Sequence, residues 1–190
     1  VWDPQIIKRF DLVAKHEQLK QHEVVSMLLL NSGPRIASVE HTHVIYILEA
    51  TTSSARKLLK HLKQIISNDD RRLFHALFVP DASIALKERL KEDAGTSAHL
   101  KSVISLPIRI YPIYDDFFSS FLPDTVAKLL IHKDWTELHK CASAVLQIQM
   151  LCRKTPNFRC FGKWAAQAIR ILKEVRGEAR CDYKSYGEWN

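Results

Sequence analysis

Apolar runs and helical patterns alternate along the first part of the chain. Five short apolar segments are predicted as β-strands, because they are rich in Val, Ile, Leu and Phe and are bounded by polar or proline-containing turns. Prolines are expected to break the last of them near its ends. The predicted strands are a segment that ends at Trp2, Glu23 to Leu30, His43 to Leu48, Leu73 to Val79, and Ser102 to Pro112.

Helices are predicted between these strands, over Phe10 to Lys20, Ser54 to Ile66 and Ser83 to Asp93. The second of them has a continuous apolar stripe that includes Leu58 and Leu62. Strands that are apolar on both faces and separated by helices require a parallel sheet covered on both sides. The sequence therefore predicts an α/β fold with a five-stranded, doubly wound parallel sheet of the flavodoxin type.

The pattern changes after Pro123, where we predict a domain boundary. Three more segments have helical periodicity, and no strand is predicted between them: Asp124 to His132, Asp134 to Cys152, and Gly162 to Val175. The predicted organisation is a first α/β domain over 1–123, the helical start of an incomplete second domain over 124–178, and an irregular tail over 179–190.

The charge is unevenly distributed along the chain. The 190 residues are 46% hydrophobic with a net charge of +7, which is a globular composition, and no apolar run reaches the roughly 18 residues that span a bilayer. Residues 140–190 hold ten Lys and Arg against four Asp and Glu. A solvated face, or one covered by further chain, is favoured over nucleic acid as the reason for this excess. Nucleic acid is therefore not expected as a partner.

The cysteines and histidines do not form a recognisable metal site. The four cysteines lack CxxC spacing, which indicates free thiols, a reducing compartment and a cytoplasmic location. His41 and His43 share one strand face without further ligands, so a strand entrance is favoured over a metal site. The chain opens at Val1 without a signal peptide or a starting Met, and we expect a fragment that is cut in the middle of a strand.

No catalytic set is evident in the sequence. The five glycines are scattered, so GxGxxG and P-loop motifs are absent. The turn from Glu49 to Ser54 has no glycine to let backbone amides close around a phosphate. Asp115 and Asp116 follow the last predicted strand, and the alternative interpretation is a magnesium- or nucleotide-binding enzyme centred on this pair. A polar turn is favoured there, and we expect no catalytic residue, cofactor or metal.

A family resemblance is carried by five segments in a fixed order over about residues 1–178. They are Phe10 to Val24 (FDLVAKHEQLKQHEV), Phe74 to Glu92 (FHALFVPDASIALKERLKE), Ile110 to Ser120 (IYPIYDDFFSS), Asp134 to Gln149 (DWTELHKCASAVLQIQ) and Phe161 to Glu174 (FGKWAAQAIRILKE). In order and spacing they resemble the SM family, cytosolic proteins that bind syntaxins and govern SNARE-driven membrane fusion. The resemblance implies an arch-shaped protein of three domains, of which this chain supplies the first domain and the start of the second.

The resemblance also implies a function and a set of contact residues. A binding role without catalysis is implied, with syntaxin-type SNAREs as partners. Contacts are expected from the helix after the first strand and from the loop after the second. The implied SNARE-binding residues are Lys15, Glu17, Lys20, Asn31 and Arg35.

The opening Val1-Trp2-Asp3 and the segment LKQHEV, Leu19 to Val24, resemble one branch of the family. That branch supplies the SM subunit of the HOPS and CORVET tethers. It implies transport to the endosome, lysosome or vacuole, binding of other tether subunits through downstream domains, and peripheral attachment to these membranes through partners only. The family's basic pair after FVP is replaced by Asp81-Ala82, and its strand-end RP by Glu49-Ala50, which indicates a diverged relative.

Overall fold

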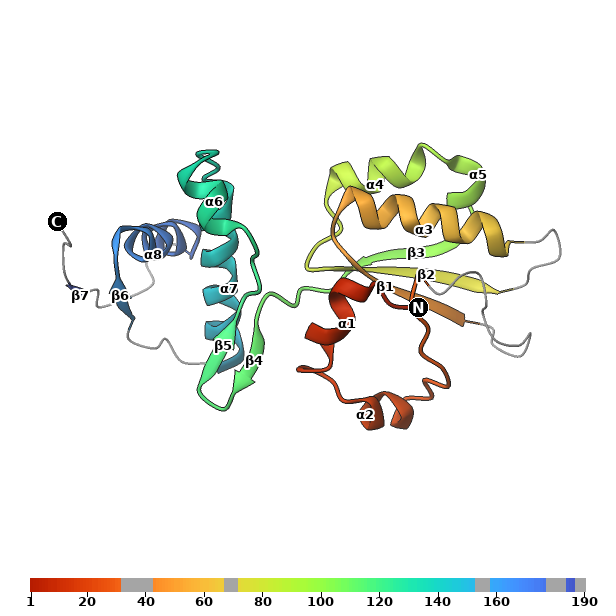
Figure 1. Cartoon of the computed structure of the whole chain (residues 1–190), viewed down its shortest axis with the longest axis horizontal. Coiled ribbons are helices and arrows are strands. Elements are labelled where there is room, and N and C mark those ends of the chain that lie inside the picture. The colour runs from red at the N-terminus through yellow and green to blue at the C-terminus, as the bar shows by residue number, and fades with distance from the viewer. Residues whose placement is uncertain (32–42, 67–71, 153–157, 177–183, 187–190) are drawn as a thin grey trace. The chain divides into compact units, whose positions relative to one another are not determined.

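The computed structural model in Figure 1 forms two compact units, Val1–Tyr111 and Pro112–Asn190, and each is described by itself. No helix in the described part of the chain is long and apolar enough to cross a membrane. The structure describes residues 1–31, 43–66, 72–152, 158–176 and 184–186.

The first unit is built around a parallel sheet with the strand order β1-β2-β3. Helices α3, α4 and α5 lie on one side of this sheet, and α1 and α2 lie on the other (Figure 1). In chain order the elements are α1 (Pro4–Phe10), α2 (His16–Gln21), β1 (His43–Glu49), α3 (Thr52–Ile65), β2 (Leu73–Val79), α4 (Ile84–Lys91), α5 (Ala94–Ser97) and β3 (Leu100–Ser105).

Trp2 extends the sheet beyond β1. It makes isolated parallel bridges to Ile47 of β1 and to Leu29. Its backbone N–H donates to the Leu28 carbonyl at 2.7 Å, and the Leu30 N–H donates to the Trp2 carbonyl at 2.9 Å. The chain segments thus run in the order Leu29, Trp2, β1, β2, β3, as in a doubly wound sheet. The α/β class is confirmed, whereas five strands are not: the sheet in the described residues has three.

The segment from Glu23 to Leu30 is not the strand that its apolar run predicts. Its neighbour in the sheet is Trp2, and α1 begins at Pro4, so the partner ends before a ladder can form. Glu23 also has a positive φ of 62°, which turns the chain at the start of the segment. An apolar run favours burial, but extended pairing needs a neighbour of matching length.

The main core lies between the sheet and α3 and α4. Alternate residues of β1 point into it, and Tyr46 and Leu48 are fully buried. Leu58 and Leu62 of α3 belong to the same buried cluster, as do Leu86 and Leu90 of α4. Every second residue of the strand and every third or fourth residue of the helix is apolar. The apolar side of the strand therefore packs against the apolar side of the helix.

A smaller apolar cluster lies on the opposite face of the sheet. It explains why the structure has two helices, α1 and α2, in the region where a helix was predicted over Phe10 to Lys20. Trp2, Ile6 and Val79 form its buried centre, and both Phe10 and Leu19 pack against it. Periodicity placed Phe10 and Leu19 on a single helix over Phe10 to Lys20, and this prediction is wrong. The chain turns after α1 and α2 starts anew, so the two side chains reach one cluster from different helices.

The predicted strand from Ser102 to Pro112 also has different bounds. β3 begins at Leu100 and ends at Ser105, after which the Leu106 N–H donates to the Phe78 carbonyl at 2.9 Å. Pro107 then removes a donor from the chain, and a ladder cannot continue through it. Pro112 lies in a separate strand, β4.

The second unit combines helices with short strands. β4 and β5 pair with each other, and β6 and β7 pair in parallel. In chain order the elements are β4 (Tyr111–Tyr114), β5 (Phe117–Ser119), α6 (Thr125–Leu130), α7 (Thr136–Cys152), β6 (Arg159–Phe161), α8 (Lys163–Arg176) and β7 (Lys184–Tyr186).

These strands depart from the prediction of a purely helical segment followed by an irregular tail. β6 lies between α7 and α8, and β7 lies within residues 179–190. Strands of three residues are too short for an apolar pattern to reveal. The chain divides into its two compact units after Tyr111, before the predicted boundary near Pro123, so β5 and all of β4 except Tyr111 belong to the second unit.

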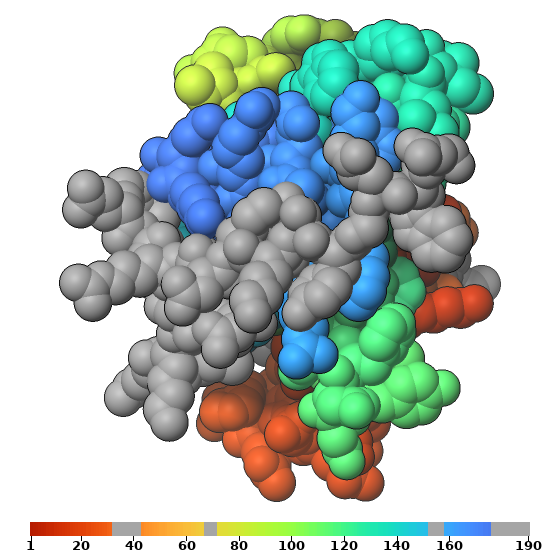
Figure 2. Space-filling view, turned by 90° about the vertical axis from the view of Figure 1, so that its left-hand side faces the viewer, coloured from red at the N-terminus to blue at the C-terminus, as the bar shows by residue number. Residues whose placement is uncertain are grey.

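The core of the second unit lies between α6, α7 and α8. Leu138 and Ala142 of α7 pack in one buried cluster with Ile169 and Leu172 of α8 and with Leu129 of α6. In Figure 2 the blue surface of α8 borders the teal surface around α6. The buried side of α8 therefore packs against the other two helices.

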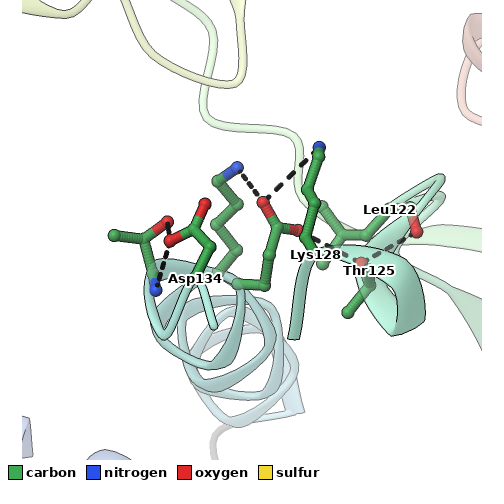
Figure 3. A network of polar contacts seen from close by, with 7 residues as sticks. Leu122, Thr125, Lys128 and Asp134 are labelled. Atoms are coloured by element: carbon green, nitrogen blue, oxygen red, sulfur yellow. Dashed lines mark hydrogen bonds and ion pairs between the residues drawn. The ribbon is translucent and has the colours of Figure 1, made fainter. Parts of the chain in front are cut away.

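A buried carboxylate joins α6 to α7 (Figure 3). Glu137 is 1% exposed, and its Oε1 lies 2.6 Å from Lys140 Nζ and 3.6 Å from Lys128 Nζ. Its Oε2 lies 3.1 Å from the Thr125 hydroxyl, which is also 2.9 Å from the Leu122 carbonyl. One carboxylate is thus bound from both helices.

Candidate partner-binding surface

Helix α2 presents three of the predicted SNARE-binding residues to solvent. The Lys15 N–H donates to Gln18 Oε1 at 2.9 Å, which closes the first turn of the helix. Leu19 holds the helix by packing against the cluster around Trp2. Lys15, Glu17 and Lys20 are exposed. A short helix anchored by one apolar side chain therefore displays a charged outer face.

The remaining two predicted residues have different outcomes. Asn31 is exposed and follows Leu30, which is buried and hydrogen-bonded to Trp2. Arg35 lies outside the described residues. The structure thus brings Asn31 to the edge of the sheet that Trp2 extends, and it places Glu17 and Lys20 on α2 and Lys15 at the amino-terminal cap of that helix.

A groove of about 860 Å³ lies between α2, the segment after it and the sheet. Leu19, His22 and Glu23 line it from α2 and its exit turn, and His43 and Ile45 line it from β1. Ile45 remains 46% exposed, as the opposite alternation of β1 requires when Tyr46 points into the core. The result is an apolar floor with polar side chains on its walls, a surface typical of protein-binding sites.

A row of polar side chains crosses the three strands on this same face of the sheet. His43 Nδ1 lies 3.0 Å from His75 Nε2, and His75 Nδ1 lies 2.8 Å from Ser102 Oγ. Burial lowers the pKa of His75, and the charges of His43 and Lys101 lower it further. His75 and Ser102 were missed by sequence reasoning, because their proximity depends on the strand register and not on their spacing in the chain.

The position where doubly wound enzymes bind ligands is occupied by internal contacts here. In such sheets the site lies beyond the carboxyl ends of the strands where the strand order reverses, which is between Trp2 and β1. Asp3 Oδ2 accepts a hydrogen bond from the Ser54 hydroxyl at 2.6 Å, and Arg9 Nη1 pairs with Glu49 Oε1 at 3.2 Å. These side chains bind one another, and the glycine-free turn contributes Thr51 as the cap of α3.

Asp115 and Asp116 do not directly follow a strand of the parallel sheet. They form the turn between β4 and β5 in the second unit, and both are exposed. Among the described residues no group of three or more His, Cys, Asp or Glu side chains could hold a metal ion. The position assumed by the enzyme alternative is therefore wrong, and a polar turn describes the pair.

The Sec1 family model matches residues 1–185 of this chain, and the chain belongs to that family, the Sec1/SM family. The resemblance carried by the five sequence segments is confirmed. Vacuolar protein sorting-associated protein 33A of Caenorhabditis elegans is 29% identical over 96% of this chain and 32% of its own length. The protein of the same name from Rattus norvegicus is 25% identical over 94% of this chain and 30% of its own length. The chain spans about a third of the relatives that it matches.

Solved structures of SM proteins share the fold. The SM protein Vps45 in complex with the Qa SNARE Tlg2 matches with a TM-score of 0.60 and 16% identity, over 96% of this chain and 33% of that chain. The Unc18–syntaxin 1 complex from Monosiga brevicollis matches with a TM-score of 0.65 and 12% identity, over 94% of this chain and 33% of that chain. At these identities the matches establish the fold and leave residue roles to be tested.

Proposed function

We propose that this chain acts in SNARE-dependent vesicle trafficking by binding syntaxin-type SNAREs. The observation that carries the proposal is its membership of the Sec1/SM family over residues 1–185. Two matched structures, of Vps45 and of Unc18, hold a Qa SNARE and a syntaxin as their partners. At the sheet's ligand position Asp3 is hydrogen-bonded to Ser54 and Glu49 is paired with Arg9, which supports a binding role in place of catalysis.

The proposed contact surface is α2 with the groove beside it. Lys15, Glu17 and Lys20 supply exposed charge, and Asn31 lies on the neighbouring segment. The groove supplies apolar area, because Leu19 and Ile45 both line it. An amphipathic SNARE helix has both kinds of surface, so it could bury its apolar face in the groove and pair its charges along α2. Arg35 is part of the same proposal.

The relatives' names support the membrane and the tether that we propose for this protein. The matched relatives are vacuolar protein sorting-associated proteins, which supports a role in transport to the endosome, lysosome or vacuole. We propose that the protein is the SM subunit of a HOPS- or CORVET-type tether. It would then reside in the cytoplasm and reach these membranes through its SNARE and tether partners.

Charge reversal on α2 tests the SNARE-binding surface. The chain is titrated against a panel of soluble endosomal and lysosomal Qa-SNARE domains, with affinity measured by calorimetry or fluorescence anisotropy. The double variant Lys15→Glu/Lys20→Glu is expected to bind at least about tenfold more weakly, since it places like charge where opposite charge is proposed.

The matched control reverses two lysines on the other side of the sheet. Lys57 and Lys60 are exposed on α3, so Lys57→Glu/Lys60→Glu makes the same change in net charge. It is expected to leave affinity within about twofold of the original chain. An equal loss of affinity in both double variants would show that the loss is a non-specific effect of charge and would contradict the proposed α2 surface. Absence of binding to every Qa-SNARE in the panel would count against the proposed function itself.

A further inference from the structure

The row His43–His75–Ser102 has the geometry of a small transition-metal site. His43 lies on β1 and His75 on β2, and their facing ring nitrogens are 3.0 Å apart. The two nitrogens of imidazoles bound to one tetrahedral zinc ion lie about 3.3 Å apart, given zinc–nitrogen distances of 2.0–2.1 Å. The two histidines are therefore within a few tenths of an ångström of the spacing that a bound ion requires.

The third side chain of the row fixes the orientation of one ring. His75 Nδ1 lies 2.8 Å from Ser102 Oγ, so the Nδ1–H can donate to this hydroxyl. Nε2 of the same ring then carries a lone pair and accepts a hydrogen bond from the His43 Nδ1–H, whose proton a bound metal ion would displace. Metal-binding histidines are commonly oriented in this way by a hydrogen bond from the nitrogen that does not bind the metal.

We propose that His43 Nδ1 and His75 Nε2 bind a divalent transition-metal ion of the zinc class, with Ser102 as the residue that positions His75. The ring centroids are 5.2 Å apart and the interplanar angle is 24°. Once His43 Nδ1 has lost its proton, a small rotation of the rings would direct both nitrogen lone pairs to one ion. Imidazole nitrogen is a preferred ligand of zinc, copper and nickel.

The rest of the coordination sphere is open. The metal would take water, or a side chain from a bound partner, at the positions that the two histidines leave. His43 also lines the groove beside α2, so these positions lie next to the proposed partner-binding surface. This metal site rests on the His–His–Ser geometry alone and stands whether or not the groove binds a SNARE.

Zinc titration of the full chain tests the site. Zn²⁺ is added in competition with a chromophoric chelator, and long-range ¹H–¹⁵N spectra of the imidazoles report which ring nitrogens bind. In the unaltered chain we expect the His43 Nδ1 and His75 Nε2 resonances to shift on addition of zinc. His43→Ala and His75→Gln should each weaken binding at least tenfold, and Ser102→Ala by about tenfold.

His99→Ala is the matched control, since His99 is exposed and lies outside the row. It is expected to leave zinc affinity unchanged, and thermal unfolding of every variant checks that each is folded. The spectra of the unaltered chain need no variant, so they decide the matter even if a substitution impairs folding. The proposal is overturned if zinc leaves both imidazole resonances in place, or if His99→Ala weakens binding as much as His43→Ala.

Discussion

Glu137 shows how one side chain can hold two helices together. Burial by itself would raise the pKa of its carboxyl group. The hydrogen bond and charge of Lys140, the Thr125 hydroxyl and the charge of Lys128 outweigh burial, so the pKa lies below its ordinary value of 4.5. A carboxyl group whose pKa is lowered by folding stabilises the folded state in its ionised form.

Glu137→Gln is therefore expected to destabilise the second unit by about 1–3 kcal/mol near pH 7, because charge-assisted hydrogen bonds are lost from a buried position. The effect depends on pH with a definite sign. The stabilisation is complete above the pKa of the unfolded chain and is lost as pH falls through the lower pKa of the folded state. The difference between original and variant should thus be largest above about pH 5 and shrink below it. Urea unfolding at several pH values measures it.

An exposed glutamate of the same unit provides the comparison. Glu174 lies 4.0 Å from Arg170, and both side chains are mostly exposed. Glu174→Gln should change the free energy of unfolding by less than about 0.5 kcal/mol, as is usual for surface pairs. If Glu137→Gln behaved like Glu174→Gln, the buried network would not hold α6 and α7 together.

Residue-scale contacts were the least predictable from the sequence. Asp134 lies just before α7, where a carboxylate can accept hydrogen bonds from the first N–H groups of a helix, and it accepts one from the Thr136 N–H at 3.0 Å. Nothing in the spacing of Asp3 and Ser54, or of His43 and His75, indicates that they touch. Their contacts follow from which strands pair and in what register, and that is a property of the whole sheet.

At the scale of elements, α2 combines a short length with an exposed surface. It has six residues, and Leu19 anchors it to the cluster around Trp2. An isolated helix of this length is unstable in water, so its stability depends on that packing. The geometry of Lys15 and Lys20 therefore depends on a side chain that need not touch the partner itself.

Leu19→Ala is expected to loosen α2 while the sheet remains folded. Backbone amides of α2 should exchange with solvent faster, whereas those of β1 should keep their protection. SNARE affinity should also fall if α2 forms the contact surface. Leu12→Ala is the matched control, because Leu12 is 38% exposed in the turn before α2 and should change neither measurement. Unaltered α2 exchange in Leu19→Ala would contradict the anchoring role.

At the scale of elements, prediction succeeded where the apolar residues of one helix or strand all pack against a single neighbouring element. α3 was predicted from a stripe that packs on the sheet, and β1 and β2 from runs buried against it. Prediction failed where apolar residues of different elements share one cluster, as Phe10 and Leu19 do. It also failed where strand pairing is limited by a short partner, because periodicity carries no information about the length of a neighbour.

At the scale of the whole molecule, the change from an alternating to a helical pattern predicts a domain boundary near Pro123, and the structure divides the chain into two compact units after Tyr111. The division after Tyr111 could not be predicted from the sequence, because the hairpin of β4 and β5 continues the apolar pattern of β3. Family membership came from order and spacing over nearly the full chain. The contact surface for a partner remains a prediction, because it depends on molecules that the sequence does not describe.

The two units differ in how completely their central elements are buried. In β1, Tyr46 and Leu48 are fully buried, and the strand is paired with β2 on one side and bridged by Trp2 on the other. In the second unit an apolar cavity of about 490 Å³ lies between α6, α7 and α8, and Val175 near the end of α8 is 64% exposed. Apolar walls that face a cavity lose packing contacts, which lowers the free energy of local opening.

We therefore expect the second unit to open at lower free energy than the first. Native-state hydrogen exchange, followed by mass spectrometry of peptides from the full chain, measures both units under the same conditions. Amides of α8, from Lys163 to Val175, should exchange faster than those of β1, from Val44 to Leu48, because β1 exchanges only when the sheet core opens. A small apolar molecule that fills the cavity should slow exchange in α8 and leave β1 unchanged. Protection in α8 equal to that in β1 would mean that both units unfold as one, and the argument from the cavity would fail.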